Sequence, residues 1–564
     1  MSRLVVLLLL LLPSLPPRVA AETPTAMVAA ADPLAVSAGL SILKAGGNAM
    51  DAAIAVQMVL GVVEPQSSGL GGGAFLLHYD AASGRVTSWD GRETAPAGAR
   101  PDLFLAPDGN PMPFREAVLG GRAVGVPGTA RMLEAAHRAN GKLPWAALIA
   151  PAIRLAEAGF PASGRLAHDI AVNADKLRRQ PAARGYFLTP DGAPLVAGTI
   201  LRNQPLADTM RALAAEGADA LNRGAIAANI SAAVRADPNP GSMTPDDLAA
   251  YTPKERSPVC GPYRGHTVCG MGPPSSGGVA VLQILGMLAH FDLPHLAPDG
   301  ADAGQAIVEA ERLAYADRAR YLADTDFVPA PVAGLIAPDY LAIRAQPIDL
   351  DRAIPQPRAG NPLWPSALPA LAPQPSQLEH GTSDVAIIDA AGNAVALTTT
   401  IESEFGTGLM VRGFVLNNEL TDFSFRPEID GRLVANRVQP GKRPRSAMAP
   451  TLVFDNKGKL ELVLGSAGGA RIIGYVAQAL VEMLDWHRTP AQALATPHVL
   501  SIGDAAELEA DTPAVRLGPA LTARGQKIVV RPLPSGSAAI AVTAEGLAGG
   551  ADPRREGIAL GESP

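Results

Sequence analysis

The chain has 564 residues, a formal net charge of −7 and a sequence pI near 5.8. This length exceeds one ordinary domain, although one large core with insertions is compatible with it. The mild acidity and the lack of a basic block argue against nucleic acid as a partner. The 57 glycines and 52 prolines are spread along the chain without a repeat, so they indicate many tight turns.

The first 21 residues are typical of a signal peptide. Arg3 precedes an apolar run over residues 4–12, and after a proline-rich break Val19 and Ala21 fit the −3 and −1 positions of a cleavage site. The run is too short to span a bilayer. We therefore expect cleavage after Ala21, no membrane anchor after signal removal, and a periplasmic or secreted location. A retained anchor is the less favoured alternative.

Residues 33–62 have helical periodicity that breaks at Gly46-Gly47-Asn48, where one helix should end and Asn48 or Asp51 should cap the next. The glycine-rich stretch 64–74 imitates a dinucleotide-binding fingerprint. That fingerprint requires a following helix, whereas residues 75–80 are typical of a strand. We interpret the glycines as allowing two backbone segments to approach closely.

Arg92 ends the next predicted strand. It is either a solvated surface residue or a bidentate clamp for a substrate carboxylate, a role that suits arginine better than lysine. Residues 125–249 are predicted to be largely helical. A second glycine-serine loop, 272–278, precedes an apolar helix ending at Leu288, and an amphipathic helix covers residues 305–322.

The two cysteines, Cys260 and Cys269, flank a turn, so both could lie on adjacent strands. Export is compatible with a disulfide. Two buried free thiols are about as compatible, because hairpin geometry often disfavours bridging. No His, Cys and carboxylate cluster has metal-ligand spacing, so no metal site is predicted.

Residues 355–377 contain seven prolines, which exclude helix and central strand, so we expect an exposed, mobile linker. After it the chain becomes rich in strands. The predicted elements are strands at 415–418, 451–454, 460–464 and 528–531 and one helix at 472–484.

A hairpin follows the linker, because apolar β-branched runs flank the break Ala390-Ala-Gly-Asn393. If Asp389 faces Asn393, Thr382 lies opposite Thr400. Directly opposed side chains have Cβ atoms about 4.5–5.5 Å apart, so two hydroxyl groups would meet at the mouth of the hairpin. On local pattern alone, an ordinary threonine-rich strand pair is the simpler interpretation.

Several short motifs lie elsewhere along the chain. They are Gly-Gly-Asn-Ala-x-Asp-Ala-Ala at 46–53, Ser-Ser-Gly-x-Gly-Gly-Gly at 67–73, Arg92-Glu93, Pro274-Ser-Ser-Gly-Gly278, Phe405-Gly-Thr-Gly408 and Ala551-Asp-Pro-Arg-Arg555. In number and order, they make nearly the whole mature chain resemble the γ-glutamyltranspeptidase family of N-terminal-nucleophile hydrolases. The resemblance implies an α/β fold in which two antiparallel sheets lie between helical layers, a four-layer αββα sandwich.

The resemblance also implies a proenzyme that cuts its own Gly381–Thr382 bond. The large subunit, 22–381, and the small subunit, 382–564, would stay together as a heterodimer with one intertwined core. Thr382 Oγ would attack the preceding carbonyl, and the α-amine thereby released has an ordinary pKa of about 7.7–8, which suits a general base. Thr382 would thus be nucleophile and base, with Thr400 as its hydrogen-bond partner. No cofactor is implied.

The family pattern assigns further roles. Gly468 and Gly469 would supply the oxyanion hole. Arg92, helped by Ser446, would bind the α-carboxylate of the substrate, and Glu419 and Asp422 its α-ammonium. The implied activity is cleavage of γ-glutamyl amides such as glutathione, with transfer of the acyl group to water or to the amine of an amino acid or peptide.

The sequence departs from the family pattern at the substrate pocket. Ala447 stands where a second serine is usual, and Glu402 where an asparagine is usual. Glu402 could still bind an ammonium group but would repel a nearby carboxylate. Asp384 occupies a position where His is common. Two alternatives follow: a glutaryl-type (cephalosporin acylase-like) amidohydrolase of the same fold, and an unprocessed, non-catalytic binding protein.

Overall fold

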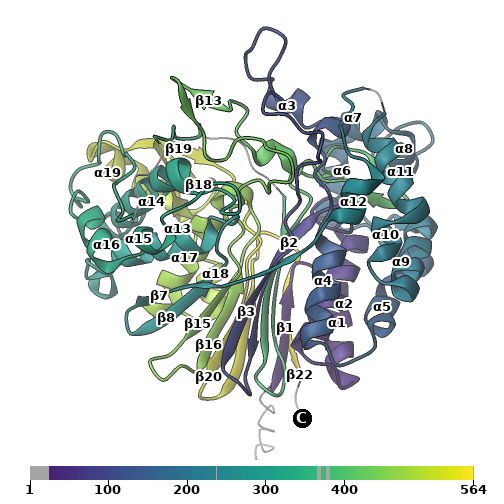
Figure 1. Ribbon diagram of the computed structural model, residues 1–564. Coiled ribbons are helices and arrows are strands. Elements are labelled where there is room, and N and C mark those ends of the chain that lie inside the picture. Colours follow the sequence, from purple (N-terminus) through teal and green to yellow (C-terminus); the bar gives the residue numbers. More distant parts are fainter. Residues whose placement is uncertain (1–23, 237, 365–369, 376–380, 563–564) are drawn as a thin grey trace, which may run out of the picture.

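The computed structural model describes residues 24–236, 238–364, 370–375 and 381–562. Two antiparallel sheets lie face to face, with helices on both outer sides (Figure 1). One sheet has the order β22 (Ile558–Glu562), β1 (Ala26–Ala30), β9 (Ser383–Ile388), β10 (Ala394–Thr400), β2 (Gly73–Asp80), β3 (Arg85–Asp90) and β6 (Lys254–Arg256). The other has the order β21 (Gly546–Ala551), β20 (Ala538–Thr543), β16 (Leu460–Gly465), β15 (Thr451–Phe454), β8 (His266–Gly270) and β7 (Val259–Tyr263).

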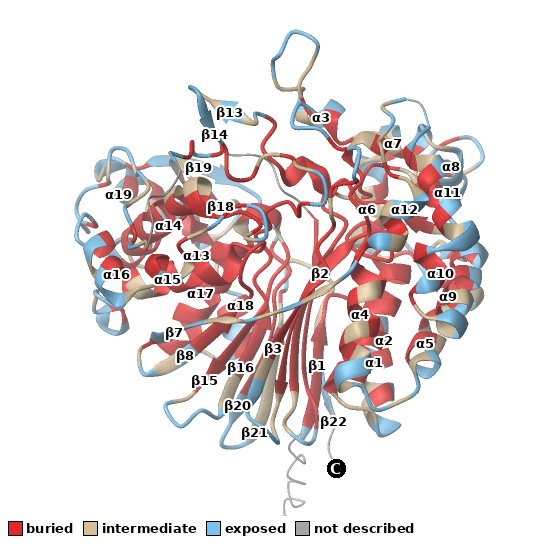
Figure 2. Ribbon diagram, viewed as in Figure 1, coloured by how far each residue is buried: buried red, intermediate tan, exposed pale blue. Residues whose placement is uncertain are grey.

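Three buried clusters fill the spaces between four layers (Figure 2). Helices α1 (Pro33–Lys44) and α2 (Ala49–Val63) cover the first sheet. Helices α13 (Gly277–Leu288), α14 (Ala301–Tyr321) and α17 (Ile472–Leu484) cover the second. A smaller cluster that includes Ala386, Leu452 and Ile540 joins the two sheets. The predicted αββα sandwich is confirmed.

Most predicted elements are confirmed. Asn48 caps α2 in a capping box with Asp51, and α17 has the predicted bounds. The helical region contains α4 (Thr129–Asn140), α5 (Trp145–Ala158), α6 (Gly164–Val172), α7 (Ala174–Arg178), α8 (Pro181–Phe187), α9 (Gln204–Glu216), α10 (Asp219–Asn222), α11 (Gly224–Val234) and α12 (Pro245–Ala250). The signal-peptide prediction lies outside the described residues. Within the described part of the chain, no helix is both long and apolar enough to cross a membrane.

The glycine loop before β2 permits the predicted close backbone approach. A side chain at Gly71 would overlap the carbonyl oxygen of Val415, and one at Gly72 would overlap that of Thr400. The loop therefore presses against the end of β10, where the second threonine lies.

The register of the hairpin is as predicted. Ser383 pairs with Thr399 and Ile388 with Ala394, and the amide of Asp389 donates to the carbonyl of Asn393 at 3.0 Å. The Asp389 carboxylate also accepts from the Ala391 and Asn393 amides in the turn, both at 2.9 Å. These bonds fix the turn and therefore the strand ends.

Two predictions were wrong in part. The described part of 355–377 forms no helix or named strand, as expected, but it is not wholly exposed: Leu371, Ala372 and Gln374 are buried. The reason is that residues 370–372 contain no proline, so the Ala372 amide can donate to the Leu433 carbonyl at 3.0 Å. This hydrogen bond anchors the segment. The predicted strand at 415–418 ends at Val415 in β12 (Phe414–Val415), because the side chains of Asn417 and Asn418 bond to the following turn. Asn417 Oδ1 accepts from the Glu419 amide at 2.9 Å, and Asn418 Nδ2 donates to Thr421 Oγ1 at 3.0 Å.

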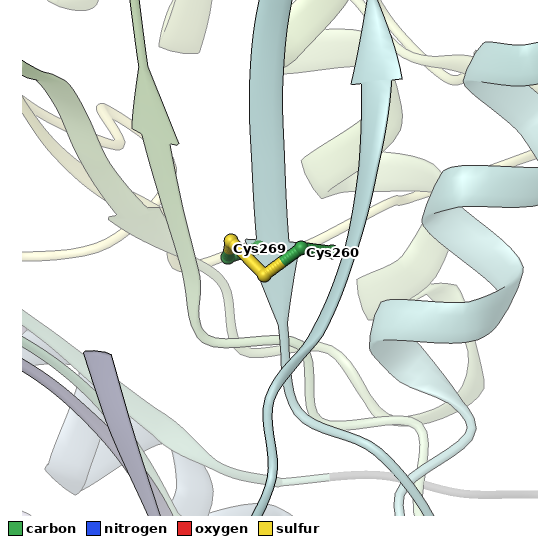
Figure 3. Close-up of a disulfide and its surroundings, with 2 residues drawn as sticks. All are labelled: Cys260 and Cys269. Carbon is green, nitrogen blue, oxygen red and sulfur yellow. A yellow bond between two sulfur atoms is a disulfide. The ribbon is translucent and has the colours of Figure 1, made fainter. Parts of the chain in front are cut away.

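The two cysteines form a disulfide and are not free thiols. Cys260 on β7 and Cys269 on β8 lie opposite each other and are bonded through their sulfur atoms (Figure 3). The bridge ties the edge strand β7 to the rest of the second sheet.

Candidate active site

One small pocket gathers residues from five distant parts of the chain. Its lining consists of Arg92, Thr382, Thr400, Glu402, Glu419, Asp422, Ser446, Ala447, Met448, Gly469 and Ile472. Gly468 directly precedes Gly469, one of these lining residues, in the sequence. The structure therefore brings together every site residue that the sequence predicted. In the intact chain the pocket has a cavity volume of about 10 Å³, close to the space of one water molecule.

The two threonines meet at the mouth of the hairpin. Thr382 Oγ1 donates to Thr400 Oγ1 at 3.2 Å, and the Glu402 amide donates to the same Thr400 oxygen at 2.8 Å. Arg555 Nη1 donates to the Thr382 carbonyl at 2.8 Å. Both threonines are buried, so the Thr382 hydroxyl is held in one orientation between fixed partners.

The Gly381–Thr382 peptide bond lies against the two predicted oxyanion-hole residues. The amide of Gly468 donates to the carbonyl oxygen of Gly381 at 3.3 Å. Gly468 and Gly469 both have positive φ, and Gly469 begins the 3₁₀ turn η4 (Gly469–Arg471) before α17. A backbone N–H in this position stabilises negative charge that develops on the carbonyl oxygen.

Gly381 is also confined by its neighbours. Its φ is +80°, and an added Cβ would overlap the carbonyl oxygen of Glu402. Only glycine fits this site without strain. The carbonyl carbon of Gly381 is therefore unshielded by any side chain of its own residue.

Arg92 is almost fully buried and is surrounded by acceptors. Its guanidinium forms very short ion pairs with Glu419 and Asp422, and it donates to the carbonyls of Pro444 and Arg445, each at 3.1 Å. The surface alternative for Arg92 is therefore excluded. In the intact chain, the residues assigned to the α-carboxylate and the α-ammonium of the substrate bind each other.

Carboxyl groups outnumber cations in this pocket. Burial raises the pKa of Glu402 well above its ordinary value, and the charges of Asp422 and Glu419 raise it further. Burial and Glu419 raise the pKa of Glu93 in the same way. Glu93, Glu419 and Asp422 pair with the guanidinium of Arg92, and Glu402 lines the same pocket. A cationic group bound among these carboxyl groups would offset the repulsion that raises the pKa values of Glu93 and Glu402.

Two loop segments hold the residues of this pocket in place through hydrogen bonds. Ser276 in the second glycine-serine loop donates from its amide to the Ser446 carbonyl at 2.8 Å, and the Ser446 amide donates to Pro274 at 3.1 Å. Asn418 receives the Ser403 amide at 3.0 Å and donates to the Glu402 carboxylate. The substrate-facing groups are therefore positioned by hydrogen-bonded loops.

Sequence reasoning had assigned no role to Asn418 or Arg555. Asn418 orients Glu402, and Arg555 holds the carbonyl of Thr382. Arg555 belongs to the motif Ala551-Asp-Pro-Arg-Arg555, and Asn418 directly precedes Glu419, which the family pattern assigns to the substrate. These positions were the available signal, but the groups that the two side chains contact lie too far away in sequence to be inferred.

Asp384, two residues after Thr382, points between the two sheets. It accepts a hydrogen bond from Thr398 Oγ1 at 2.8 Å, and burial raises its pKa from the ordinary value of 3.8 to about 8. The folded state therefore holds this proton more tightly than the unfolded state. The resulting stability is fully present below about pH 4 and is lost as the pH rises through about 8.

Asp384→Asn should abolish this loss. We expect the stability of the variant relative to the wild type to increase from pH 4 to pH 8. At pH 9 the melting temperature of the variant should be higher by roughly 5 °C. Thermal unfolding at pH 4, 7 and 9 measures the difference. Asp108→Asn is the matched exposed control, and an equal difference at every pH would contradict the assignment.

A match to the Gamma-glutamyltranspeptidase family model covers residues 35–562. The chain is 41% identical to the glutathione hydrolase proenzyme of Bacillus subtilis (strain 168), over 95% of this chain and 91% of that relative. It is 36% identical to the acylase ACY 1 proenzyme of Pseudomonas sp. (strain SE83), over 93% and 91%.

Among solved structures, the cephalosporin acylase of Bacillus halodurans superposes with a TM-score of 0.84 at 28% identity and covers 98% of both chains. Its likeness extends through both sheets and the helical layers that carry the site. From the family match, the curated relatives and this fold, the chain belongs to the gamma-glutamyltranspeptidase family.

Proposed function

We propose that this protein is an exported, self-processing γ-glutamyl hydrolase and transferase. One observation carries the proposal: the Gly381 carbonyl accepts from the Gly468 amide while the adjacent Thr382 hydroxyl is bonded to Thr400. The bond to be cut is thus seated among the groups that would later act on substrate. Export is part of the proposal because residues 1–21 have the pattern of a signal peptide.

Processing would begin with attack by Thr382 Oγ on the Gly381 carbonyl carbon. The Oγ–C bond forms, the C–N bond breaks, and the hydroxyl proton passes to the departing nitrogen. Water then hydrolyses the ester, which leaves a Gly381 carboxylate and a Thr382 residue with a free hydroxyl and a free α-amine. The Gly468 amide stabilises the oxyanion in each step.

Catalysis would repeat this chemistry on an external amide. The α-amine of Thr382 takes the hydroxyl proton as Oγ attacks the γ-carbonyl, and it returns the proton to the leaving amine. Water or another amine then resolves the acyl-enzyme. Arg92 would exchange its present partners for the α-carboxylate, and Glu419 and Asp422 would turn to the α-ammonium.

The charge balance of the pocket favours a γ-glutamyl donor over a glutaryl donor. A glutaryl group brings a carboxylate without an ammonium, so it adds negative charge beside Glu419 and Asp422 and offsets neither of them. Ala447 and the related acylases support the second candidate, because Ala447 removes one hydroxyl from the pocket. A pair of p-nitroanilides, γ-glutamyl and glutaryl, differs only in the ammonium. We expect kcat/KM to favour the γ-glutamyl compound by about 10²-fold or more, and a glutaryl preference would reverse the assignment.

Purified protein tests processing directly. Scaling the 58.0 kDa chain by length gives fragments of roughly 37 and 19 kDa for residues 22–381 and 382–564. The smaller band should begin Thr-Ser-Asp-Val on N-terminal sequencing. A single intact band would support the non-catalytic binding protein.

Gly381→Ala should slow processing. The new methyl group would overlap the Glu402 carbonyl at a residue with positive φ, so the scissile bond must move away from Gly468. We expect cleavage about 10²-fold slower or more, measured as the rate at which the intact band disappears on a gel.

Gly392→Ala is the matched control for this variant. Gly392 also has a positive φ, +84°, but lies in the hairpin turn, where a Cβ would meet only Ala81 at an ordinary 3.5 Å. It should carry a similar backbone strain of about 1 kcal/mol and process at the wild-type rate. Equal rates for the two glycine variants would contradict the crowding at residue 381.

A further inference from the structure

A cavity of about 350 Å³ lies toward the C-terminal end of helix α17, away from the active site. This volume is within the range of small-ligand sites. Ile472, the first residue of α17, lines the active-site pocket, whereas Gln478 and Glu482 line this cavity. The helix rises about 15 Å between Ile472 and Glu482, and no described residue lines both sites. We call it the distal cavity.

Most of the wall of the distal cavity is apolar. The apolar lining residues are Pro298, Ile307, Trp486, Pro497, Val499, Pro513, Ala514 and Leu517. Trp486 is fixed in place, because its indole Nε1 donates to the Leu293 carbonyl at 2.9 Å. Such a wall favours a ligand with a hydrophobic group, since binding removes apolar surface from water on both sides.

Glu482 brings an unsatisfied acceptor to this wall. Its side chain is only 1% exposed, and Oε2 accepts no hydrogen bond from any described residue. Arg488 Nη1 lies 2.8 Å from this oxygen but donates to Thr496 Oγ1 at 2.7 Å. Burial raises the pKa of Glu482 to about 7, and the charge of Arg488 opposes this rise. An ammonium group of a ligand would satisfy the carboxylate and stabilise its charge.

Arg488 presents the opposite charge directly beside this carboxylate. A guanidinium binds a carboxylate through paired hydrogen bonds. An α-amino acid has its ammonium and its carboxylate on one carbon, so the adjacent Glu482 and Arg488 can bind both groups at once. The other charged lining residues, Asp299 and Arg516, are exposed and of opposite sign. The charges around the cavity therefore balance, which favours a ligand without net charge.

We propose that the distal cavity binds a free α-amino acid with a large apolar side chain. The ammonium group would bind Glu482 and the carboxylate would bind Arg488. The side chain would pack against Ile307, Trp486 and Leu517. This site is separate from the proposed catalytic activity, because none of its lining residues belongs to the active-site pocket.

Four small molecules separate the three parts of this recognition. L-Phenylalanine has an ammonium group, a carboxylate and an apolar side chain. Glycine lacks the side chain, phenethylamine lacks the carboxylate, and 3-phenylpropanoate lacks the ammonium group. We expect L-phenylalanine to bind about tenfold or more tighter than each of the other three, because each of them loses one set of contacts. Isothermal titration calorimetry measures the four dissociation constants.

The titrations are made on the wild type and on the uncleaved Thr382→Ala chain. The active-site pocket of the intact chain has space for about one water molecule, so it cannot hold the amino acid. L-Phenylalanine should therefore bind both proteins. Binding to the wild type alone would assign the ligand to the active site and overturn the distal site. Because Thr382→Ala needs no activity, this result does not depend on the proposed function.

Gly304 provides a variant that fills the distal cavity. It lies on α14 in the lining, where an added Cβ would meet Val499 and Leu517 at an ordinary 3.6 Å. Gly304→Leu should abolish binding of L-phenylalanine, whereas Gly304→Ala, the matched control, should still bind it. Thermal unfolding checks that both variants are folded. Binding that persists unchanged in folded Gly304→Leu would overturn the location of the site.

Glu482→Gln tests the ammonium contact without changing the shape of the side chain. We expect it to weaken L-phenylalanine binding by about tenfold or more and to leave 3-phenylpropanoate binding unchanged. Asp299→Asn removes an exposed carboxylate from the same lining and should change neither affinity. Equal affinities of the wild type for L-phenylalanine and 3-phenylpropanoate, or an unchanged L-phenylalanine affinity in Glu482→Gln, would overturn the recognition of an amino acid.

Discussion

Thr382→Ala is expected to remain a single uncleaved chain and to lose γ-glutamyl amide hydrolysis by about 10⁴-fold or more. The change removes the hydroxyl that donates to Thr400 and that would attack the Gly381 carbonyl. The hydroxyl of Thr400, which contacts that of Thr382, is not placed to replace it, because the Glu402 amide donates to Thr400 Oγ1 at 2.8 Å. Gel electrophoresis and p-nitroaniline release measure the two effects separately.

Thr382→Ser is the control, because it keeps the hydroxyl and loses only a methyl group. We expect it to process and to retain activity at a reduced rate. Thermal unfolding should show that Thr382→Ala is folded. Appearance of two bands in Thr382→Ala would show that another residue cuts the chain.

Arg92→Met is expected to have the second largest effect. It leaves Glu419 and Asp422 buried without their shared cation, and breaking a buried ion pair in this way costs about 3–5 kcal/mol. Any matured fraction should lose about 10²-fold or more in kcat/KM for γ-glutamyl donors, because the α-carboxylate has no partner. Denaturant unfolding and initial rates measure the two losses.

A compensated variant separates stability from recognition. Adding Glu419→Gln and Asp422→Asn to Arg92→Met removes the unpaired charges, so much of the lost stability should return. Activity should not return, since neither charge of the substrate would then be recognised. Recovery of both would mean that Arg92 serves only to neutralise its neighbours.

Local patterns in the sequence predicted the hairpin and its register. The turn Ala390-Ala-Gly-Asn393 and the alternation around it leave one way to align the strands, and Thr382 then faces Thr400. The bounds of α17 could also be predicted from the local sequence, because a long apolar run ends before a polar turn.

The stacking of the layers could not be derived locally. Strand β1 pairs with β22 at the other end of the chain and with β9 in the middle. The family resemblance supplied the four layers, but the order of the strands was not predicted. The same resemblance named Arg92, but its ion pair with Glu419 joins residues 327 positions apart. Prolines in the linker predicted the lack of regular structure correctly, yet they carry no information about burial at Leu371.

The placement of the Gly381 carbonyl against Gly468 has a kinetic consequence. The bond to be cut belongs to the molecule that cuts it, so its effective molarity greatly exceeds that of any dissolved amide. On the proposed mechanism, activation is first order in protein and independent of dilution. Dissolved γ-glutamyl compounds would not compete with it, because the substrate pocket of the intact chain has space for about one water molecule. The rate of activation would therefore be set within each molecule and not by the concentration of protein or substrate.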